Sequence, residues 1–168
     1  MLLNIKISLN LTTSIIKLSA IPAYAGYDFG GFYTGKAGTG TQMVDASGNF
    51  TVASKTQYGS AGATATWYAH WIPDGATPFV VNHYTQNLGA TTYTLHSTEN
   101  KTGTTAASIT LASYKKTISG FTYLEGFAGT SATGTTKPSS GAVTSTTILA
   151  SGTRVINLYY NRTQYSFT

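Results

Sequence analysis

The chain has 168 residues, enough for one domain or two small ones, and its charged residues leave a net charge of +5. It has no Cys, which excludes a disulfide framework and a thiolate metal site. The basic residues are scattered rather than arranged in a stripe, so we expect no nucleic-acid binding. No run of apolar residues approaches the roughly twenty needed to span a membrane, so we expect no membrane insertion.

The composition is typical of a β protein. Thr is the commonest residue, and there are 12 Tyr, 7 Phe and 18 Gly. Thr and the aromatic residues favour strands, and Gly favours the turns between them. The apolar fraction of 41% is too high for a disordered chain. The sequence therefore predicts a mainly β fold, with α+β as the alternative.

Residues 1–25 have two interpretations. Lys6 could be the charged start of a secretory signal peptide, with Ala23-Tyr24-Ala25 as its cleavage site. Polar residues interrupt the apolar run, however. We favour the second interpretation, in which 5–11 and 14–22 are strands of a shortened first module.

The segment "GGFYTGKAGTGTQ" (30–42) contains the spacing G-x-x-x-x-G-K that occurs in phosphate-binding loops. Such a loop also needs a hydroxyl residue after the Lys and a helix that follows it. Here Ala37 follows Lys36, and "GTGT" (38–41) is a poor start for a helix. We therefore predict that these glycines form turns and bulges, and we expect no cofactor.

The chain contains an internal repeat. "GYDFGGFYTGKAGTGT" (26–41) aligns without a gap with "GFTYLEGFAGTSATGT" (120–135). Downstream, "ATATWYAHW" (63–71) corresponds to "TRVINLYYN" (153–161). The second copy has Thr130 in place of the Lys, which also argues against a phosphate site. Two related modules are therefore predicted, with a turn-rich joint between them.

Alternation of apolar and polar residues predicts the strands of the second module. These strands are expected at 78–86, 91–101, 121–127, 143–149 and 153–162. A short strand that runs into a helical turn is expected within 105–118, and a Gly/Ser/Thr-rich loop at 128–142. The tail 163–168 alternates again and is expected to begin a further, truncated strand.

We find no catalytic or metal-binding constellation in the sequence. The carboxylates do not pair at close spacing and are expected to lie in turns or in solvent: Asp28, Asp45, Asp74, Glu99 and Glu125. His70, His83 and His96 all fall in predicted strands. His83 and His96 could face one another across a hairpin, but no third ligand is evident. We therefore predict that the protein is not an enzyme and has no metal site.

Aromatic residues are the strongest remaining signal. The ones considered are Tyr27, Phe29, Phe32, Tyr33, Trp67, Tyr68, Trp71, Tyr84, Tyr93, Tyr159 and Tyr160. Small modules have thin cores, so most of these rings are expected to be buried, and a minority in a groove could stack on sugars. Alternation places Trp71 and Tyr159 on the apolar faces of the two closing strands, and we expect both to be buried.

Two motifs suggest a family. "GYDFGGFYTGKAGTGTQ" together with "WYAHW" (67–71) resembles the Listeria–Bacteroides repeat, also called the internalin B-repeat. The second module, with "VVNHYTQN" and "INLYYNR", resembles mucin-binding-protein-type repeats. On this resemblance residues 1–74 form the first module, N-terminally shortened, and residues 75–162 form the second. The resemblance implies β-grasp-like modules in tandem on exported, wall-attached bacterial adhesins.

The resemblance also sets the functional expectation. It implies a non-catalytic stalk or spacer module on the bacterial cell surface, whose partners are neighbouring repeat modules of a larger chain. The alternative is a module that binds host glycans or mucins through exposed aromatic rings. Cell-wall polymer is a further possible partner. The sequence singles out no binding residue for any of these ligands.

Overall fold

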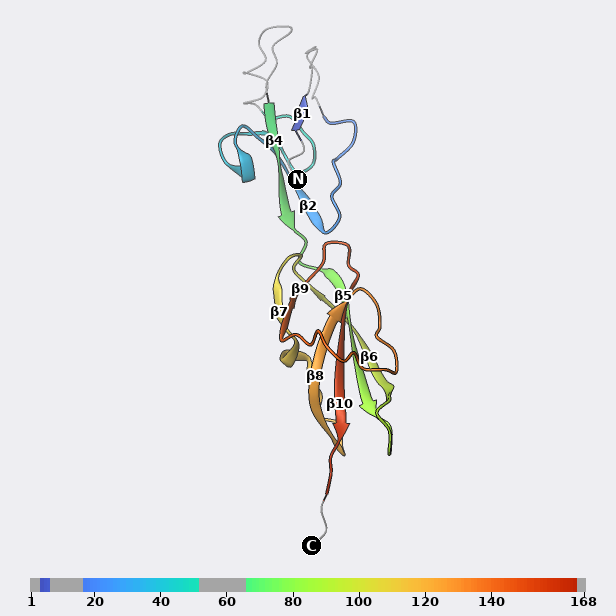
Figure 1. Cartoon of the computed structure of the whole chain (residues 1–168). Coiled ribbons are helices and arrows are strands. Elements are labelled where there is room, and N and C mark those ends of the chain that lie inside the picture. The colour runs from blue at the N-terminus through green and yellow to red at the C-terminus, as the bar shows by residue number, and fades with distance from the viewer. Residues whose placement is uncertain (1–3, 7–16, 52–65, 166–168) are drawn as a thin grey trace, which may run out of the picture. The chain divides into compact units, whose positions relative to one another are not determined.

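The computed structural model describes residues 4–6, 17–51 and 66–165, and it is mainly β, as the composition predicts (Figure 1). The chain divides into two compact units, Met1–Pro73 and Asp74–Thr168. This division falls within the turn-rich segment 72–79. The helical elements of the described residues are two short 3₁₀ turns, one in each unit.

Unit 1 (Met1–Pro73) contains an antiparallel sheet with the strand order β1-β4-β2-β3. The elements are β1 (Asn4–Lys6), β2 (Tyr27–Tyr33), the 3₁₀ turn η1 (Lys36–Gly38), β3 (Gln42–Val44) and β4 (Thr66–Pro73). The long strands β2 and β4 pair antiparallel. Their register shifts between Phe29 and Phe32, and this bulge places both Phe rings in the core.

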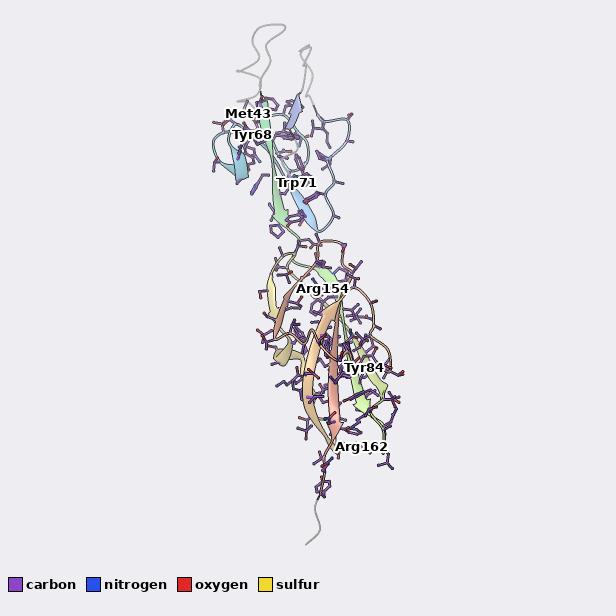
Figure 2. All side chains as sticks on the ribbon, in the orientation of Figure 1. Met43, Tyr68, Trp71, Tyr84, Arg154 and Arg162 are labelled. Atoms are coloured by element: carbon purple, nitrogen blue, oxygen red, sulfur yellow. The ribbon has the colours of Figure 1, made fainter. Side chains whose placement is uncertain are left out.

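The core of unit 1 is small and rich in aromatic residues. Its buried members are Phe29, Phe32, Met43, Val44, Phe50 and Trp67, with Leu18, Ala69 and Trp71 packed against them. Figure 2 labels Met43, Tyr68 and Trp71 in this unit. Large rings stabilise such a thin core because each of them buries more apolar area than an aliphatic side chain.

The predicted N-terminal strands are found only in part. Asn4–Lys6 pairs with β4 and overlaps the strand that we expected at 5–11 by two residues, and residues 7–16 lie outside the described residues. The expected strand at 14–22 is wrong over its described part, 17–22. Lys17 forms one isolated bridge with Asn49, and the following residues form no strand. Pro22 has no amide N–H with which to extend such a ladder.

Unit 2 (Asp74–Thr168) contains a mixed four-stranded sheet with the order β6-β5-β10-β8 and a small ladder, β7-β9. The elements are β5 (Thr77–Gln86), β6 (Tyr93–Gly103), β7 (Ser108–Thr110), the 3₁₀ turn η2 (Leu111–Tyr114), β8 (Phe121–Gly129), β9 (Ser145–Thr147) and β10 (Arg154–Arg162). The first and last strands, β5 and β10, are parallel and central, and every other pairing in this sheet is antiparallel. This mixed sheet agrees with the predicted mainly β fold.

Both faces of the unit 2 sheet are covered. One face carries an aliphatic and aromatic cluster that includes Phe79, Leu111, Ile156 and Tyr160. The β6–β8 connection, which carries β7 and η2, covers this face together with the segment around β9. The other face carries the rings of Tyr84, Tyr93, Phe127 and Tyr159.

The loop that we expected at 128–142 has a structural role. It lies across the second face of the sheet, where the backbone N–H of Tyr93 donates to the Thr135 oxygen (2.8 Å). The hydroxyl of Tyr159 contacts the Gly134 oxygen (3.4 Å) and the hydroxyl of Thr133. The loop therefore closes a second small core, which alternation within the strands does not reveal.

The internal repeat corresponds to equivalent strand pairs in the two units. Gly26 and Gly120 both have a positive φ (72° and 78°) and stand directly before β2 and β8. β2 pairs antiparallel with β4, and β8 pairs antiparallel with β10. The described strands of unit 1 contain no parallel pair like β5 and β10. In the tail, Thr163 donates its N–H to the Gly120 oxygen, and residues 163–165 form no strand.

Candidate functional site

The glycine-rich segment 30–42 folds around a histidine from β4. A Cβ atom at Gly30 would lie 2.9 Å from His70 Nδ1, and a Cβ at Gly38 would lie 2.8 Å from the same atom. The ring of Tyr33 packs edge-on against the imidazole, with 5.6 Å between the ring centroids. The absence of side chains at these two glycines therefore makes room for His70.

The rest of this segment forms turns. The 3₁₀ turn η1 has three residues, and Ala37 within it has a left-handed backbone (φ 54°). At Gly31 φ is 110°, and a Cβ there would lie 2.3 Å from the Val44 carbonyl oxygen. Over the described stretch 36–51, no α-helix follows Lys36 whose N-terminus could face a phosphate. The predicted turn and bulge roles explain the spacing of these glycines.

Two of the five carboxylates hold turns, as expected. Asp45 accepts hydrogen bonds from the backbone and side chain of Asn49 (2.8 and 3.0 Å), and the Asn49 side chain is the main reason that the pKa of Asp45 is lowered. Asp74 accepts a hydrogen bond from the Ala76 N–H at 2.8 Å. Asp28 is exposed on β2. Among the described residues none of these three carboxylates forms an ion pair, although the charge of Lys17 also helps to lower the pKa of Asp45.

Glu99 and Glu125 form ion pairs rather than standing free in solvent, so that part of the expectation is wrong. Glu99, on β6, contacts the ammonium groups of Lys101 (2.5 Å) and Lys116. These two groups, Lys101 first, lower the pKa of Glu99 to about 2. Glu125, on β8, pairs with Lys137 from the loop over the second face. The Glu99–Lys116 and Glu125–Lys137 pairs each tie a covering segment to the sheet. Lys101 lies on the same strand as Glu99.

His83 and His96, which could have faced one another across the hairpin, do not do so. His83 lies opposite Ser97, and His96 falls in the bulge that follows, where it is exposed. His83 is fully buried, and its Nδ1 lies 3.0 Å from Tyr160 Oη. Its Nε2 faces Glu99 Oε1 at 3.5 Å, longer than an ordinary hydrogen bond. Burial is the main reason that the pKa of His83 is lowered, and the charge of Lys116 adds to it.

Buried polar side chains join the two central strands of unit 2. Asn82 Nδ2 donates to Asn157 Oδ1 at 3.1 Å, and both amides are at most 5% exposed. Thr98 Oγ1 donates to Asn82 Oδ1 (2.8 Å), and Asn157 Nδ2 donates to the Ser131 oxygen (3.3 Å). The amides therefore connect β6, β5, β10 and the covering loop in one network.

The contacts between β5 and β10 lie on both faces of the sheet. On the face of the two amides, the rings of Tyr84 and Tyr159 stack with their centroids 5.1 Å apart and an interplanar angle of 15°. On the opposite face, His83 contacts the Tyr160 hydroxyl, which also accepts the Lys116 N–H at 2.9 Å. Burial raises the pKa of both Tyr159 and Tyr160.

Sequence reasoning missed this network. The available signal was an Asn at the same place in two strongly apolar strands, "VVNHY" (80–84) and "VINLY" (155–159). A buried amide needs a partner, so two such residues in adjacent strands indicate one another. The sequence alone did not tell us that these strands were neighbours.

The aromatic residues are mostly buried, as expected. Of the eleven rings considered, those that are buried are Phe29, Phe32, Trp67, Tyr84, Tyr93, Tyr159 and Tyr160, and the other four are half-buried. The expectation for Tyr159 is confirmed at 0% exposed, whereas the expectation for Trp71 is wrong because this ring is half-buried. Trp71 lies near the end of β4, where its covering ring, Tyr24, is itself 44% exposed.

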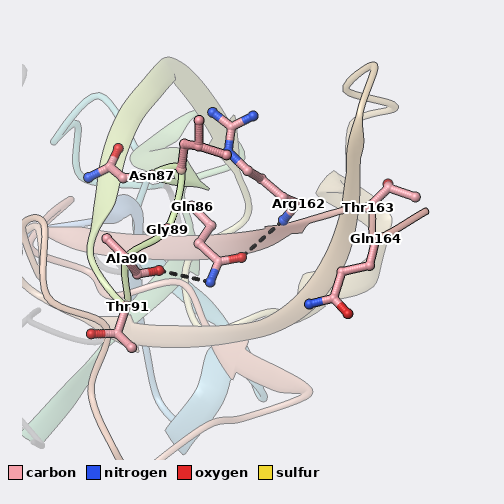
Figure 3. A pocket seen from close by; sticks show the side chains of 9 residues that line it. Gln86, Asn87, Gly89, Ala90, Thr91, Arg162, Thr163 and Gln164 are labelled. Atoms are coloured by element: carbon pink, nitrogen blue, oxygen red, sulfur yellow. Dashed lines mark hydrogen bonds between the residues drawn. The ribbon is translucent and has the colours of Figure 1, made fainter. Parts of the chain in front are cut away.

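A shallow pocket of about 430 Å³ lies where β5 and β10 end, at their C-terminal residues Gln86 and Arg162 (Figure 3). It is lined by Gln86, Asn87, Leu88, Gly89, Ala90, Thr91, Arg162, Thr163 and Gln164. The side-chain amide of Gln86 in this pocket already forms hydrogen bonds within the protein. Its Nε2 donates to the Ala90 oxygen (3.0 Å), and its Oε1 accepts the Arg162 N–H (3.1 Å). No aromatic ring lines it, so it lacks a surface on which a sugar could stack.

Within the described residues no group of His, Cys, Asp and Glu is placed to hold a metal ion. None of the helical segments described is long and apolar enough to cross a membrane. Comparisons with protein-family models, curated proteins and solved structures found no match for this chain. The resemblance to surface repeats therefore rests on the motifs alone.

Proposed function

We propose that this chain is a non-catalytic spacer segment of a bacterial surface adhesin. The observation that carries the proposal is the path of the backbone through unit 2. Because β5 and β10 are parallel and adjacent, the chain enters at the end of the sheet where Thr77 lies and leaves at the opposite end after Arg162. A module built in this way adds its own length to any chain of which it is a part.

The use of the polar groups supports the same proposal. Glu99 and Glu125 are neutralised by lysines, and Asp45 and Asp74 hold turns. The buried amides and His83 bond to neighbouring strands. These groups serve the fold, and none converges with a second reactive group on an open pocket. The motif resemblance supports the extracellular, wall-associated setting.

One observation favours the alternative, a glycan-binding module. Tyr24 is 44% exposed and stacks on Tyr27 with 4.9 Å between the centroids, next to Trp71. An exposed ring of this kind is a surface on which a sugar could stack. We rank this function second, because one exposed ring does not by itself orient a saccharide.

A glycan array at physiological ionic strength, with mucin and wall polymer as further ligands, separates the two functions. For the spacer we expect no saturable binding, and only a weak attraction from the +5 charge that fades as salt is added. The matched variants are Tyr24→Ala, which removes the exposed ring, and Tyr165→Ala, which removes another exposed tyrosine elsewhere. A salt-resistant interaction that Tyr24→Ala abolishes and Tyr165→Ala preserves would establish the glycan-binding function instead.

A further inference from the structure

The two strands through which the chain enters and leaves unit 2 are hydrogen-bonded to each other along their length. Their register runs from Phe79 opposite Arg154 to Thr85 opposite Tyr160. Tension applied to the chain pulls the start of β5 one way and the end of β10 the other, along the strand axes. In this shear geometry the bonds of the ladder carry the force together, and no bond can open before the others.

The position of these strands in the sheet adds to this resistance. Both β5 and β10 are central, with β6 and β8 on their outer sides, so neither can peel away from a free edge (Figure 1). Side chains join the same two strands on both faces, through the pair Asn82–Asn157 and the contact of His83 with Tyr160. All four residues are at most 5% exposed, so water has little access with which to replace these bonds.

We propose that the β5–β10 pair is a mechanical clamp, which gives unit 2 the further function of holding its fold while the chain is under tension. This goes beyond the spacer function, because a spacer can fulfil its role without resisting force. The inference rests on unit 2 alone. The force would come from any two attachment points that pull on the chain before Thr77 and after Arg162.

The experiment is single-molecule pulling of the full chain through engineered cysteines. The natural chain has no Cys, so each pair of handles is unique. Ala76→Cys with Gln164→Cys pulls β5 against β10 in shear. Ala76→Cys with Thr104→Cys pulls at one end of the antiparallel β5–β6 ladder, where Thr77 lies opposite Gly103 and the bonds open in sequence. All three handle positions are exposed.

At equal loading rate we expect the shear pair to unfold at a severalfold higher force than the unzipping pair. Asn157→Ala removes the amide bond between β5 and β10 but keeps the Thr98–Asn82 bond to β6, so it should lower the force mainly in the shear geometry. Ile148→Ala, in the core but outside both strands, is the control for lost equilibrium stability. It should lower the shear force less than Asn157→Ala at a comparable loss of equilibrium stability.

Equal forces for the two handle pairs would contradict the clamp and leave the spacer proposal standing. A lower force for the shear pair would contradict it in the same way. A salt-resistant glycan interaction would contradict the spacer proposal and leave the force comparison unaffected. If the shear force exceeds the unzipping force but Asn157→Ala and Ile148→Ala lower it equally, the assignment of the clamp to the side-chain bonds is wrong.

Discussion

The side-chain amide of Asn82 donates a hydrogen bond to Asn157 across 3.1 Å, between the two central parallel strands of unit 2. Neither amide has free access to solvent, and each also bonds a further element of the unit. A buried amide that loses its partner bears the cost of desolvation without compensation. The pair therefore favours one register of β5 against β10, because a shift by one residue would separate the amides.

Asn157→Ala should lower the free energy of unfolding of unit 2 by roughly 1–3 kcal/mol, because it leaves the buried Asn82 Nδ2 without its acceptor. Thr122→Ala is the control, since it removes an exposed hydroxyl contact to Thr163 on the surface of the same unit. It should change the stability by less than about 0.5 kcal/mol. Urea denaturation followed by far-UV circular dichroism measures both. Equal effects of the two variants would show that the buried amide pair contributes nothing special.

Trp67→Ala should destabilise unit 1 by about 3–5 kcal/mol, because this ring is only 1% exposed in a core of six buried side chains. Trp71→Ala should cost at least about 1 kcal/mol less, because its ring is half-buried. The chain has two Trp residues and both lie in unit 1, so the fluorescence of the remaining one follows the unfolding of that unit. If Trp71→Ala lowered the free energy of unfolding more than Trp67→Ala, the core of unit 1 would be centred nearer the C-terminal end of β4.

Gly38→Ala should destabilise unit 1 more than Gly134→Ala destabilises unit 2. The two glycines have nearly equal φ (75° and 74°), so the backbone strain of adding a Cβ is shared. At Gly38 the new Cβ also meets the His70 ring at 2.8 Å, whereas at Gly134 nothing lies within 4 Å. In the double variant Gly38→Ala, His70→Ala, the added cost of Gly38→Ala should be smaller than in the natural background. Additive effects of the two substitutions would contradict the proposed fit between His70 and the glycine-rich turn.

The stability of unit 2 should fall in two stages as the pH decreases. The folded pKa of His83 is below its ordinary 6.5, so below pH 6.5 the unfolded chain binds a proton that the folded chain does not. Its contribution to the loss therefore begins near pH 6.5. Glu99 has a folded pKa of about 2 against its ordinary 4.5, so the stability it provides is complete above pH 4.5 and is lost as the pH falls toward 2.

Urea midpoints measured from pH 8 to pH 3 test this sequence of events. His83→Gln should flatten the first stage and preserve the second. Glu99→Gln removes the carboxylate that Lys101 and Lys116 contact, and it should flatten the second stage. A natural chain whose stability is constant between pH 6.5 and pH 5 would show that His83 takes up its proton equally in both states.

Much of the strand pattern could be predicted from the sequence, because alternation is a local property. The segment 78–86 became β5 and 153–162 became β10, each within one residue at either end. The helical turn expected within 105–118 is η2. Such segments carry their own signal in the spacing of Val, Ile and Tyr, whichever strand lies beside them.

The side of the sheet on which each side chain lies, and the residues that pack against it, could not be predicted in the same way. The bulge after His83 shifts the alternation, so that His96 points to solvent and Glu99 lies on the face of His83. Alternation correctly placed Trp71 on the apolar face. How much of its ring is covered depends on Tyr24, which lies about fifty residues away in the sequence and was not expected to pack there.

The most direct test of the account is the distance between spin labels on Ala76→Cys and Gln164→Cys in the full chain. The claim is that the chain passes through unit 2 from one end of its sheet to the other along the parallel pair β5 and β10. With a rise of about 3.3 Å per residue along the strands, this path predicts a separation of about 40 Å. A separation below about 20 Å would place entry and exit at the same end, and would contradict both the spacer proposal and the clamp.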